Sequence, residues 1–249
     1  MLAVVLAGGY AKRLWPLTLN RPKALLPVAG KPMIDYVVDK LVILNPRVSR
    51  IVVSTNLRFQ SQFEDWMATR NGGGIELMPE KSLKEDEKLG AVKALADIVD
   101  KMGEEPVLVL PGDNLFTDSL EGLVGFFREK RASVVGLYDA RSVDETRKGS
   151  NVTVDEDGKV LEFVEKPVQP KSTLVGAAIY VFPAGIGRRF RQYLRLGLNV
   201  DEPGRFVEWL CKQEPVYGYM FKDYVWDIGT LESYWAAEEF YSKEEGTLP

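Results

Sequence analysis

Residues 2–9 read LAVVLAGG, a run of six apolar residues that ends in two glycines. An apolar run of this length, closed by a turn signal, is typical of a strand buried on both faces. Paired glycines at the carboxyl end of such a strand let the backbone approach a ligand closely. The run lacks the basic start of a signal peptide and is too short to span a membrane. We therefore expect a buried first strand in a cytoplasmic protein that has no membrane partner.

Outward from this strand, the first 140 residues alternate between short apolar runs and helical patterns. The side chains of Ile34, Val37, Val38 and Leu41 repeat at the spacing of an amphipathic helix. Such alternation builds a mostly parallel sheet with helices on both faces, as in Rossmann-like folds. The expected strands are Leu2–Ala7, Arg50–Ser54, Gly74–Met78, Pro106–Leu110 and Ala132–Tyr138, and the further helices are Phe59–Met67, Ala91–Met102 and Leu120–Lys130.

The pattern changes after residue 140, where Asp157-Gly158 lies between two apolar runs. Asp-Gly in this position is a strong signal for a β-hairpin. No linker or internal repeat divides the chain, so we expect one α/β domain over residues 1–249, with a mixed sheet and a hairpin in its second half. The elements expected there are the strands Val152–Val154, Val160–Val164, Leu174–Phe182 and Val216–Phe221 and the helices Arg188–Leu196, Phe206–Lys212 and Leu231–Tyr241.

Two absences restrict the chemistry of this chain. Its 249 residues contain no histidine and one cysteine, Cys211. Serine–histidine nucleophiles, histidine or thiolate zinc sites and CxxC redox pairs are therefore excluded. The net charge of −4 favours neither nucleic acid nor an anionic membrane as a partner. Carboxylates, lysine, arginine and backbone amides are left, and these groups suit phosphate and hard-metal chemistry.

The loop after the first strand carries four cations, Lys12, Arg13, Arg21 and Lys23, and three prolines. Its glycines fit neither the GxGxxG dinucleotide motif nor the GxxxxGK[ST] phosphate-binding loop. Prolines stiffen the segment, and glycine amides together with fixed cations suit a bound phosphate. The same composition also fits a surface loop whose charges face water.

The order of residues 8–28 resembles the signature of the sugar-phosphate nucleotidylyltransferases, GGxxxRLxPLTxxxPKxLxPV. Within that family, the sequence motifs of the chain are most similar to those of the glucose-1-phosphate thymidylyl- and uridylyltransferases. The resemblance implies a Rossmann-like, GT-A-like fold, with a nucleotide-binding half at 1–140 and a sugar-phosphate-binding half at 141–249. It implies that Arg13 and Lys23 contact the triphosphate and offset charge at the reacting phosphorus. The nucleotide contacts that it implies are Leu6, Ala7, Gly8, Gly9, Glu85, Gly90 and Asp113.

Two aspartates follow strand-like runs. Asp113 comes shortly after the fourth strand, and Asp227 comes after the Val216–Phe221 run. The two aspartates can share one ion only if both strands deliver them to the same edge of one sheet. Two such carboxylates suit Mg²⁺, which takes its other ligands from phosphates and water. The alternative is that each aspartate caps a helix, but Asp118 and Thr230 are better placed for that role. The resemblance implies that Asp113 and Asp227 bind the metal.

A Glu-Lys-Pro triplet at residues 165–167 ends the second strand of the hairpin. A lysine in this place also fits a solvated surface. The resemblance implies that Glu165 binds sugar hydroxyls, that Lys166 binds the sugar phosphate, and that Gly176 lines the sugar pocket. It also implies a sugar contact at Gly149, although the residues around this glycine depart from the Tyr-Gly-Val of the family.

The segment before the Ala91–Met102 helix is the one that the resemblance implies for reading the base. Five positions before Gly90 stands Glu85, where relatives that use uridine or thymidine nucleotides have glutamine. A carboxylate only accepts hydrogen bonds, and the guanine edge donates them. Residues 111–114 and 165–172 instead look like the thymidylyl and uridylyl branch, so the base stays open, and residues 85–88 also fit a solvated loop. Trp226 is expected to pack in the core rather than to stack on the base.

The activity that the resemblance implies is an Mg²⁺-dependent transfer of a nucleotidyl group from an NTP to a sugar 1-phosphate, which gives an NDP-sugar and pyrophosphate. The preferred pair is glucose 1-phosphate with dTTP or UTP. Alternatives are a mannose-1-phosphate guanylyltransferase, a choline- or inositol-phosphate cytidylyltransferase, and a non-catalytic nucleotide-sugar-binding regulatory subunit. A glycosyltransferase is disfavoured because residues 112–114 lack the Asp-x-Asp metal motif. A homo-oligomer and allosteric control are left open.

Overall fold

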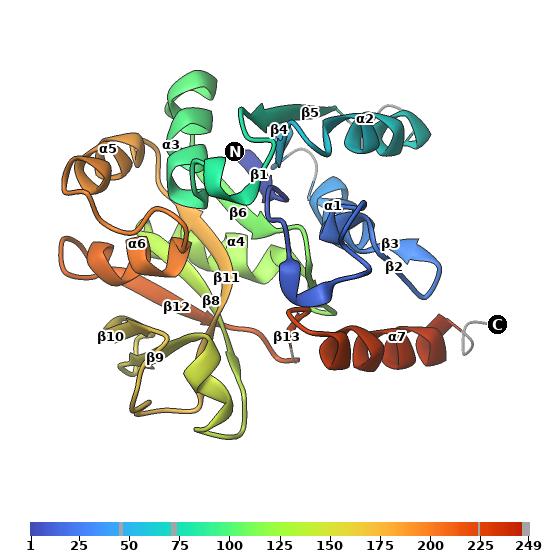
Figure 1. Cartoon of the computed structure of the whole chain (residues 1–249). Coiled ribbons are helices and arrows are strands. Elements are labelled where there is room, and N and C mark those ends of the chain that lie inside the picture. Colours follow the sequence, from blue (N-terminus) through green and yellow to red (C-terminus); the bar gives the residue numbers. More distant parts are fainter. Residues whose placement is uncertain (45–46, 71–73, 224, 246–249) are drawn as a thin grey trace.

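A computed structural model describes residues 1–44, 47–70, 74–223 and 225–245. Its centre is a mixed sheet in the order β10-β9-β11-β6-β1-β4-β5, with β8 beside β11 and β12 beside β8 (Figure 1). The nine strands of this sheet are β1 (Leu2–Leu6), β4 (Arg50–Asn56), β5 (Ile75–Glu80), β6 (Val107–Pro111), β8 (Ser133–Asp139), β9 (Ser150–Val154), β10 (Val160–Glu165), β11 (Leu174–Phe182) and β12 (Val216–Met220).

The middle of the sheet is parallel, as the sequence predicts. β1 pairs in parallel with β4 on one side and with β6 on the other, so that Val4 lies between Val52 and Val109. The first four residues of β1 are buried on both faces of the sheet. Because these three strands run in one direction, their carboxyl ends meet at one edge, where ligand-binding loops belong in such sheets.

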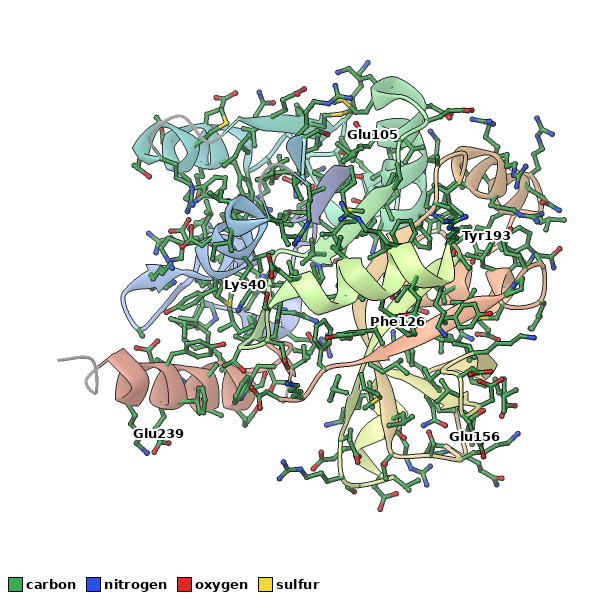
Figure 2. The ribbon with its side chains drawn as sticks, turned by 180° about the vertical axis from the view of Figure 1, so that it is seen from behind. Lys40, Glu105, Phe126, Glu156, Tyr193 and Glu239 are labelled. Atoms are coloured by element: carbon green, nitrogen blue, oxygen red, sulfur yellow. The ribbon has the colours of Figure 1, made fainter. Side chains whose placement is uncertain are left out.

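Helices cover both faces of the sheet, and this prediction is confirmed. One face packs against α1, α2 and α4, and the other packs against α3, α5 and α6. Figure 2, seen from behind, shows α4 crossing the sheet; Phe126, labelled there, packs against Tyr219 of β12 with ring centroids 5.8 Å apart. The six helices are α1 (Met33–Ile43), α2 (Gln60–Thr69), α3 (Ala91–Met102), α4 (Leu120–Lys130), α5 (Gly187–Arg195) and α6 (Pro203–Leu210).

Two helix caps were proposed from the sequence, and one of them is wrong. The hydroxyl of Ser119, not the carboxylate of Asp118, accepts the amide of Glu121 at the start of α4. Asp118 instead accepts the amide of Asp223 through Oδ2, at 2.9 Å. Thr230 does cap the last helix, since its Oγ1 accepts the amide of Ser233. Neither Asp113 nor Asp227 is therefore needed as a cap.

The second half carries the expected hairpin, in which β9 and β10 are antiparallel around Gly158. The long strand β11 then runs antiparallel to β6, β8 and β9 at different points along its length. β12 pairs in parallel with β8. In Figure 1 the hairpin projects below the sheet, on the side of β8 and β12.

A small ribbon and a final helix complete the edge where the ligand-binding loops lie. β7 (Asn114–Phe116) pairs with β13 (Val225–Asp227) in a two-stranded antiparallel sheet, and β2 (Pro27–Val28) pairs with β3 (Lys31–Pro32). The helix α7 (Leu231–Glu245) runs along this edge, apart from the main sheet (Figure 1).

The helix α7 is fastened to the early part of the chain. The hydroxyl of Tyr234 donates to the Pro27 carbonyl, and the amide of Ala29 donates to Glu238 at 2.9 Å. A third hydrophobic cluster fills the space between α7, α1 and the first loop. Among the described residues, no helix combines the length and the apolar character that crossing a membrane requires.

Candidate active site

The glycine-rich loop begins where β1 ends, at the predicted edge of the sheet. The amide of Ala7 donates to the Ser54 carbonyl at 2.8 Å, and the side-chain amide of Asn56 donates to the Gly8 carbonyl at 2.9 Å. These bonds fix the start of the loop against β4. A side chain built at Gly9 would meet nothing within 4 Å, so packing does not require glycine there. An open stretch of backbone at a strand's carboxyl end suits a bound ligand.

A cavity of about 170 Å³ lies under this loop. It is lined by residues from three separate parts of the chain, namely the first loop, the end of β6 and the turn after β13. Of the residues predicted from the sequence, those that line it are Leu6, Ala7, Gly9, Arg13, Lys23 and Asp113.

The two predicted metal-binding aspartates come together, but by a different route from the one expected. Asp227 is the last residue of β13, and it lies opposite Asn114 in the ribbon with β7. Asp113 precedes Asn114 directly, so the ribbon places the two carboxylates side by side. The prediction that the Val216–Phe221 strand delivers Asp227 to the edge of the main sheet is wrong.

The position of Asp113 also depends on a close backbone approach at Gly112. The amide of Gly112 donates to the Leu6 carbonyl at 2.8 Å, and a Cβ there would lie 3.2 Å from Val5 and 3.4 Å from Ala24. Those distances are tighter than ordinary carbon contacts. Glycine therefore lets the chain after β6 pass against the first loop, which brings Asp113 into the cavity.

Lys23 lies between the two carboxylates. Its Nζ is 2.6 Å from Oδ2 of Asp113 and 3.9 Å from Oδ1 of Asp227, and the side chain is 10% exposed. The Asp227 side chain is 69% exposed, yet the protein atoms around it partly desolvate the carboxylate and raise its pKa. The charge of Lys23 opposes this rise and that of Asp113 adds to it. A cation at this point offsets the repulsion between two neighbouring carboxylates.

Arg13 approaches the same place from the loop. It belongs to the short helix η1 (Lys12–Leu14), and one of its guanidinium nitrogens would lie 3.3 Å from a Cβ built at Gly229. Its charge also lowers the pKa of Asp227, though by less than that of Lys23. Arg13, Lys23 and the Asp113 carboxylate thus line one small cavity at this edge of the sheet, and the Asp227 carboxylate lies beside it, 3.9 Å from Lys23.

The carboxylates fit a hard divalent ion. Within the described ranges no three carboxylate, histidine or cysteine side chains converge. Mg²⁺ would therefore take Asp113 and Asp227 and leave its other positions to phosphate oxygens and water, which is how this ion is commonly held. Carboxylate oxygens are ligands for a hard ion such as Mg²⁺ and not for soft metal ions. The neighbouring cations also suit a triphosphate, which would supply further oxygens.

The four residues predicted to bind the sugar phosphate form a second cluster around Ser150, called here the sugar-side cluster. Its members are Gly149, Glu165, Lys166 and Gly176. The buried carboxylate of Glu165 accepts a hydrogen bond from the Ser150 hydroxyl, and Ser150 lies opposite Gly176 in β11. The amide of Lys166 donates to the Gly149 carbonyl at 2.9 Å. All four predicted residues are therefore neighbours.

The buried position of Glu165 destabilises the charged form of its carboxyl group. Burial raises the pKa of the carboxyl group above its ordinary value, the Ser150 hydrogen bond opposes that rise, and the nearby charge of Glu202 adds to it. The carboxylate fits there because α6 passes it at Gly204, where a Cβ would lie 1.9 Å from Oε2. A buried carboxylate of this kind is suited to accept hydroxyl groups from a ligand.

The sugar-side cluster lies near the two aspartates. The charge of Lys166 is close enough to Asp227 to lower the pKa of that carboxyl group. The side chain of Asn114 donates to the Ala177 carbonyl at 3.2 Å, which ties the ribbon to β11 next to Gly176. The ribbon that carries Asp227 is therefore tied directly to the strand that carries Gly176.

Glu85 lies in a separate, larger cavity of about 590 Å³. This cavity lies between the first loop, at Tyr10 and Trp15, and the segment after β4, at Arg58 and Phe59. The Glu85 carboxylate forms an ion pair with Lys12, and it lies on the short helix η3 (Glu85–Glu87). The structure therefore does not bring Glu85 into the cavity that Arg13 and Lys23 line, but into a different one.

Gly90 lies at the start of α3, with a φ of +89°. A Cβ there would lie 2.5 Å from the Val200 carbonyl, so the contact between α3 and residue 200 requires glycine. This packing accounts for Gly90 without a ligand, and its contact with the nucleotide stays a prediction. Trp226 packs against Phe240, with ring centroids 4.5 Å apart, as expected for a core residue.

Several residues of the site were missed by sequence reasoning. Ser150 and Asn56 hold the predicted residues Glu165 and Gly8 in place through side-chain bonds, and Asn114 ties the ribbon to Ala177 beside Gly176. Their partners lie elsewhere in the fold, so no local motif marks them. The position of Arg58 and Phe59 just after the β4 strand was the one available signal, because loops at strand ends line such sites.

Comparisons with known proteins agree with this geometry. The sequence profile of the nucleotidyl transferase family matches residues 2–244. The chain is 30% identical over 236 residues to a mannose-1-phosphate guanylyltransferase of Mycobacterium tuberculosis, which covers 93% of this chain and 62% of that protein. It is 28% identical over 265 residues to a glucose-1-phosphate adenylyltransferase of Clostridium kluyveri, which covers 100% of this chain and 68% of that protein. The chain therefore spans roughly two thirds of the length of these relatives.

Solved structures share the fold over nearly the whole chain. A Bacillus anthracis protein described as a glucose-1-phosphate thymidylyltransferase superposes with a TM-score of 0.82 at 24% identity, over 97% of this chain and 96% of that one. A UDP-glucose pyrophosphorylase complexed with UDP-glucose superposes with a TM-score of 0.81 at 21% identity, over 98% of both chains. The profile match over almost every described residue settles the classification: the chain belongs to the nucleotidyl transferase family.

Proposed function

We propose that this protein transfers a nucleotidyl group from an NTP to a sugar 1-phosphate and releases pyrophosphate. The observation that carries the proposal is the convergence of Arg13, Lys23, Asp113 and Asp227 beside the sugar-side cluster of Glu165. A non-catalytic binding subunit has no need for two carboxylates held beside two cations. Family membership and the names of the relatives support the same reaction.

The reaction needs positioning and charge compensation, and the site supplies both. An oxygen of the sugar phosphate forms a bond to the α-phosphorus of the NTP, and the bond from that phosphorus to the bridging β-phosphate oxygen breaks, so that pyrophosphate leaves. The attacking phosphate is already anionic, so no general base is required. Arg13 and Lys23 offset the charge that develops on the triphosphate. Mg²⁺ held by Asp113 and Asp227 supplies further positive charge when it is bound.

The sugar 1-phosphate is assigned to the cluster around Ser150. Glu165 accepts hydroxyl groups of the sugar, Lys166 donates to its phosphate, and Gly149 and Gly176 leave room beside them. Residues 141–249 supply this half of the site and residues 1–140 supply most of the nucleotide half. Glucose 1-phosphate is the sugar phosphate we propose, because residues 165–172 look like the thymidylyl and uridylyl branch.

The nucleoside is assigned to the larger cavity beside Glu85, next to the aromatic rings of Tyr10 and Phe59. We propose dTTP or UTP as the donor. A guanylyltransferase that uses mannose 1-phosphate is the second candidate, for two reasons. Glu85 offers a carboxylate to the donor edge of guanine, and the Mycobacterium tuberculosis relative carries that name.

A substrate matrix tests the proposal. Pyrophosphate release is measured with dTTP, UTP, GTP, ATP and CTP against glucose 1-phosphate, mannose 1-phosphate, phosphocholine and inositol phosphate, with Mg²⁺ present. Turnover of a sugar 1-phosphate supports the proposal, and the preferred pair decides between its two versions. Turnover of phosphocholine alone, or of no pair, contradicts it. A cytoplasmic location belongs to the same proposal, since the cytoplasm supplies NTPs, and cell fractionation tests it.

A further inference from the structure

Lys166 is fixed at both its backbone and its ammonium group. Its φ of +49° lies in the left-handed region that residues other than glycine rarely adopt, and its amide is held by the Gly149 carbonyl. The side chain is half exposed, yet its ammonium group pairs with the carboxylate of Glu202. Lysine carries four rotatable side-chain bonds, so a free ammonium group would sample many positions. Here the carboxylate of Glu202, which lies 36 residues further along the chain, restricts the ammonium group.

Glu202 is itself held in place by its neighbours. The Asn199 side chain accepts the amides of Asp201 at 2.9 Å and of Glu202 at 3.1 Å, and the guanidinium of Arg205 lies 3.4 Å from the carboxylate. Burial would raise the pKa of Glu202, but the hydrogen bond from Lys166 and the charges of Lys166 and Arg205 bring it below its ordinary value. The group is therefore a charged carboxylate at neutral pH.

The segment 199–202 is also anchored on the nucleotide side of the molecule. The Val200 carbonyl accepts the amide of Val92 at 2.9 Å and packs against Gly90, and Lys88 lies 3.4 Å from Asp201. One short segment thus reaches from the start of α3 to Lys166. The hydrogen bond between Val200 and Val92 therefore helps to determine the position of the Glu202 carboxylate.

We propose that Glu202 is a positioning residue that holds the Lys166 ammonium group ready to receive the phosphate of the sugar substrate. Three N–H donors are available on lysine, so two remain for the phosphate while one stays on Glu202. Restricting the ammonium group in advance reduces the entropy lost when the phosphate binds. This inference deepens the proposed function and rests on it, since it assigns a role to a residue that touches neither substrate.

Kinetics with glucose 1-phosphate and mannose 1-phosphate test this role. Glu202→Ala should raise the KM for either sugar phosphate about fivefold, the range expected when one flexible side chain must be ordered on binding. The KM for the NTP should stay within twofold. Glu202→Gln keeps an acceptor for the ammonium group and should return the sugar-phosphate KM to within twofold of the wild type. A merely structural role would move both KM values and the melting temperature.

A double-mutant cycle shows whether the effect acts through Lys166. Lys166→Ala should raise the sugar-phosphate KM about tenfold or more, because a charge-assisted contact is lost. In that background, Glu202→Ala should have no further effect. The matched control is Glu162→Ala, which removes an exposed lysine–glutamate pair with Lys171 in the same half of the chain, 2.8 Å apart. This control should leave both KM values unchanged.

Asn199→Ala provides an independent variant. It removes the side chain that holds the segment without touching Lys166, and it should raise the sugar-phosphate KM in the same direction by a smaller factor. It also carries the test if Glu202→Ala fails to fold. An unchanged or lowered sugar-phosphate KM in these variants, or effects of Glu202 and Lys166 that simply add, would overturn the inference while the wild type remains active. Failure of the wild type in the substrate matrix would instead overturn the proposed function.

Discussion

The ammonium group of Lys23 lies 2.6 Å from a carboxylate oxygen of Asp113. Lys23 comes from the first loop and Asp113 follows the fourth strand of the parallel core, so the fold, not the local sequence, makes this pair. The same ammonium group is 3.9 Å from Asp227. A divalent ion that binds both aspartates would compete with Lys23 for their oxygens. Lys23 therefore has two sets of partners, the carboxylates in the free protein and the triphosphate in the complex we propose.

Replacing Lys23 separates its two roles. Lys23→Ala should lower kcat by about 10²-fold, the range for loss of one electrostatic donor, because charge on the triphosphate is no longer offset. The same change should tighten Mn²⁺ binding, measured by electron paramagnetic resonance, because no ammonium group competes for the carboxylates. Lys31→Ala, which removes a 2.6 Å pair with Asp39, is the control and should change neither. Weaker Mn²⁺ binding in Lys23→Ala would argue against the competition.

Arg13 is expected to act on the substrate alone. Arg13→Ala should also lower kcat by about 10²-fold, while the melting temperature barely changes, because the exposed Arg13 side chain lines the cavity and is not part of the core. Steady-state assays and thermal melts check this prediction. Turnover close to that of the wild type would remove Arg13 from the reaction.

The two aspartates should both be essential. Asp113→Asn and Asp227→Asn should each abolish turnover while the fold survives, because an amide is a much poorer ligand for a hard cation. Chelation should inactivate the wild type reversibly, and Mg²⁺ or Mn²⁺ should restore it. Asp100→Asn, at an exposed ion pair with Arg191, is the control and should keep full activity. Full activity in the presence of chelator would disprove a metal role for this pair.

The raised pKa of Asp227 predicts a dependence of stability on pH in metal-free buffer. A carboxyl group whose pKa is higher in the folded state holds its proton more tightly there, so folding loses stability as pH rises from the ordinary value of 3.8 through the raised value. Asp227→Asn removes this loss. Its melting temperature should exceed that of the wild type at pH 7, and the two should converge at pH 3. An equal difference at both pH values would contradict the shift.

Glu85 should influence the choice of base. If it faces the base, Glu85→Gln should raise the preference for dTTP or UTP over purine triphosphates, because the amide adds a donor for the O4 atom. Relative kcat/KM across the five nucleotides of the substrate matrix measures the shift. Lys12→Ala, which frees Glu85 from its ion pair, should leave the order of preference as it is. An unchanged nucleotide profile in Glu85→Gln would show that the carboxylate only pairs with Lys12.

Where local periodicity was strong, the sequence predicted the fold closely. The expected bounds of α3, α4 and β11 agree with the structure, because an unbroken apolar stripe or run determines each of them. The start of α2 was placed one residue early, at Phe59, whose amide instead bonds to the Asn56 side chain before the helix begins.

The ribbon between β7 and β13 was not predictable. Each strand is three residues long, too short for a periodic pattern, and the pairing joins segments far apart in the chain. This is why Asp227 was assigned to the wrong strand. The residue itself was found because its motif resembles that of a known family. Supporting groups such as Ser150 and Glu202 have no motif, since each acts through a partner that only the fold brings near.

The ribbon also makes the pair of aspartates depend on both ends of the chain. Lys23 and Asp113 come from the first half, whereas Asp227 comes from the last strand, which pairs with β7. The helix that follows this strand is bonded to Pro27 and Ala29. The two carboxylates are therefore together only when residues 225–245 have joined the rest of the fold.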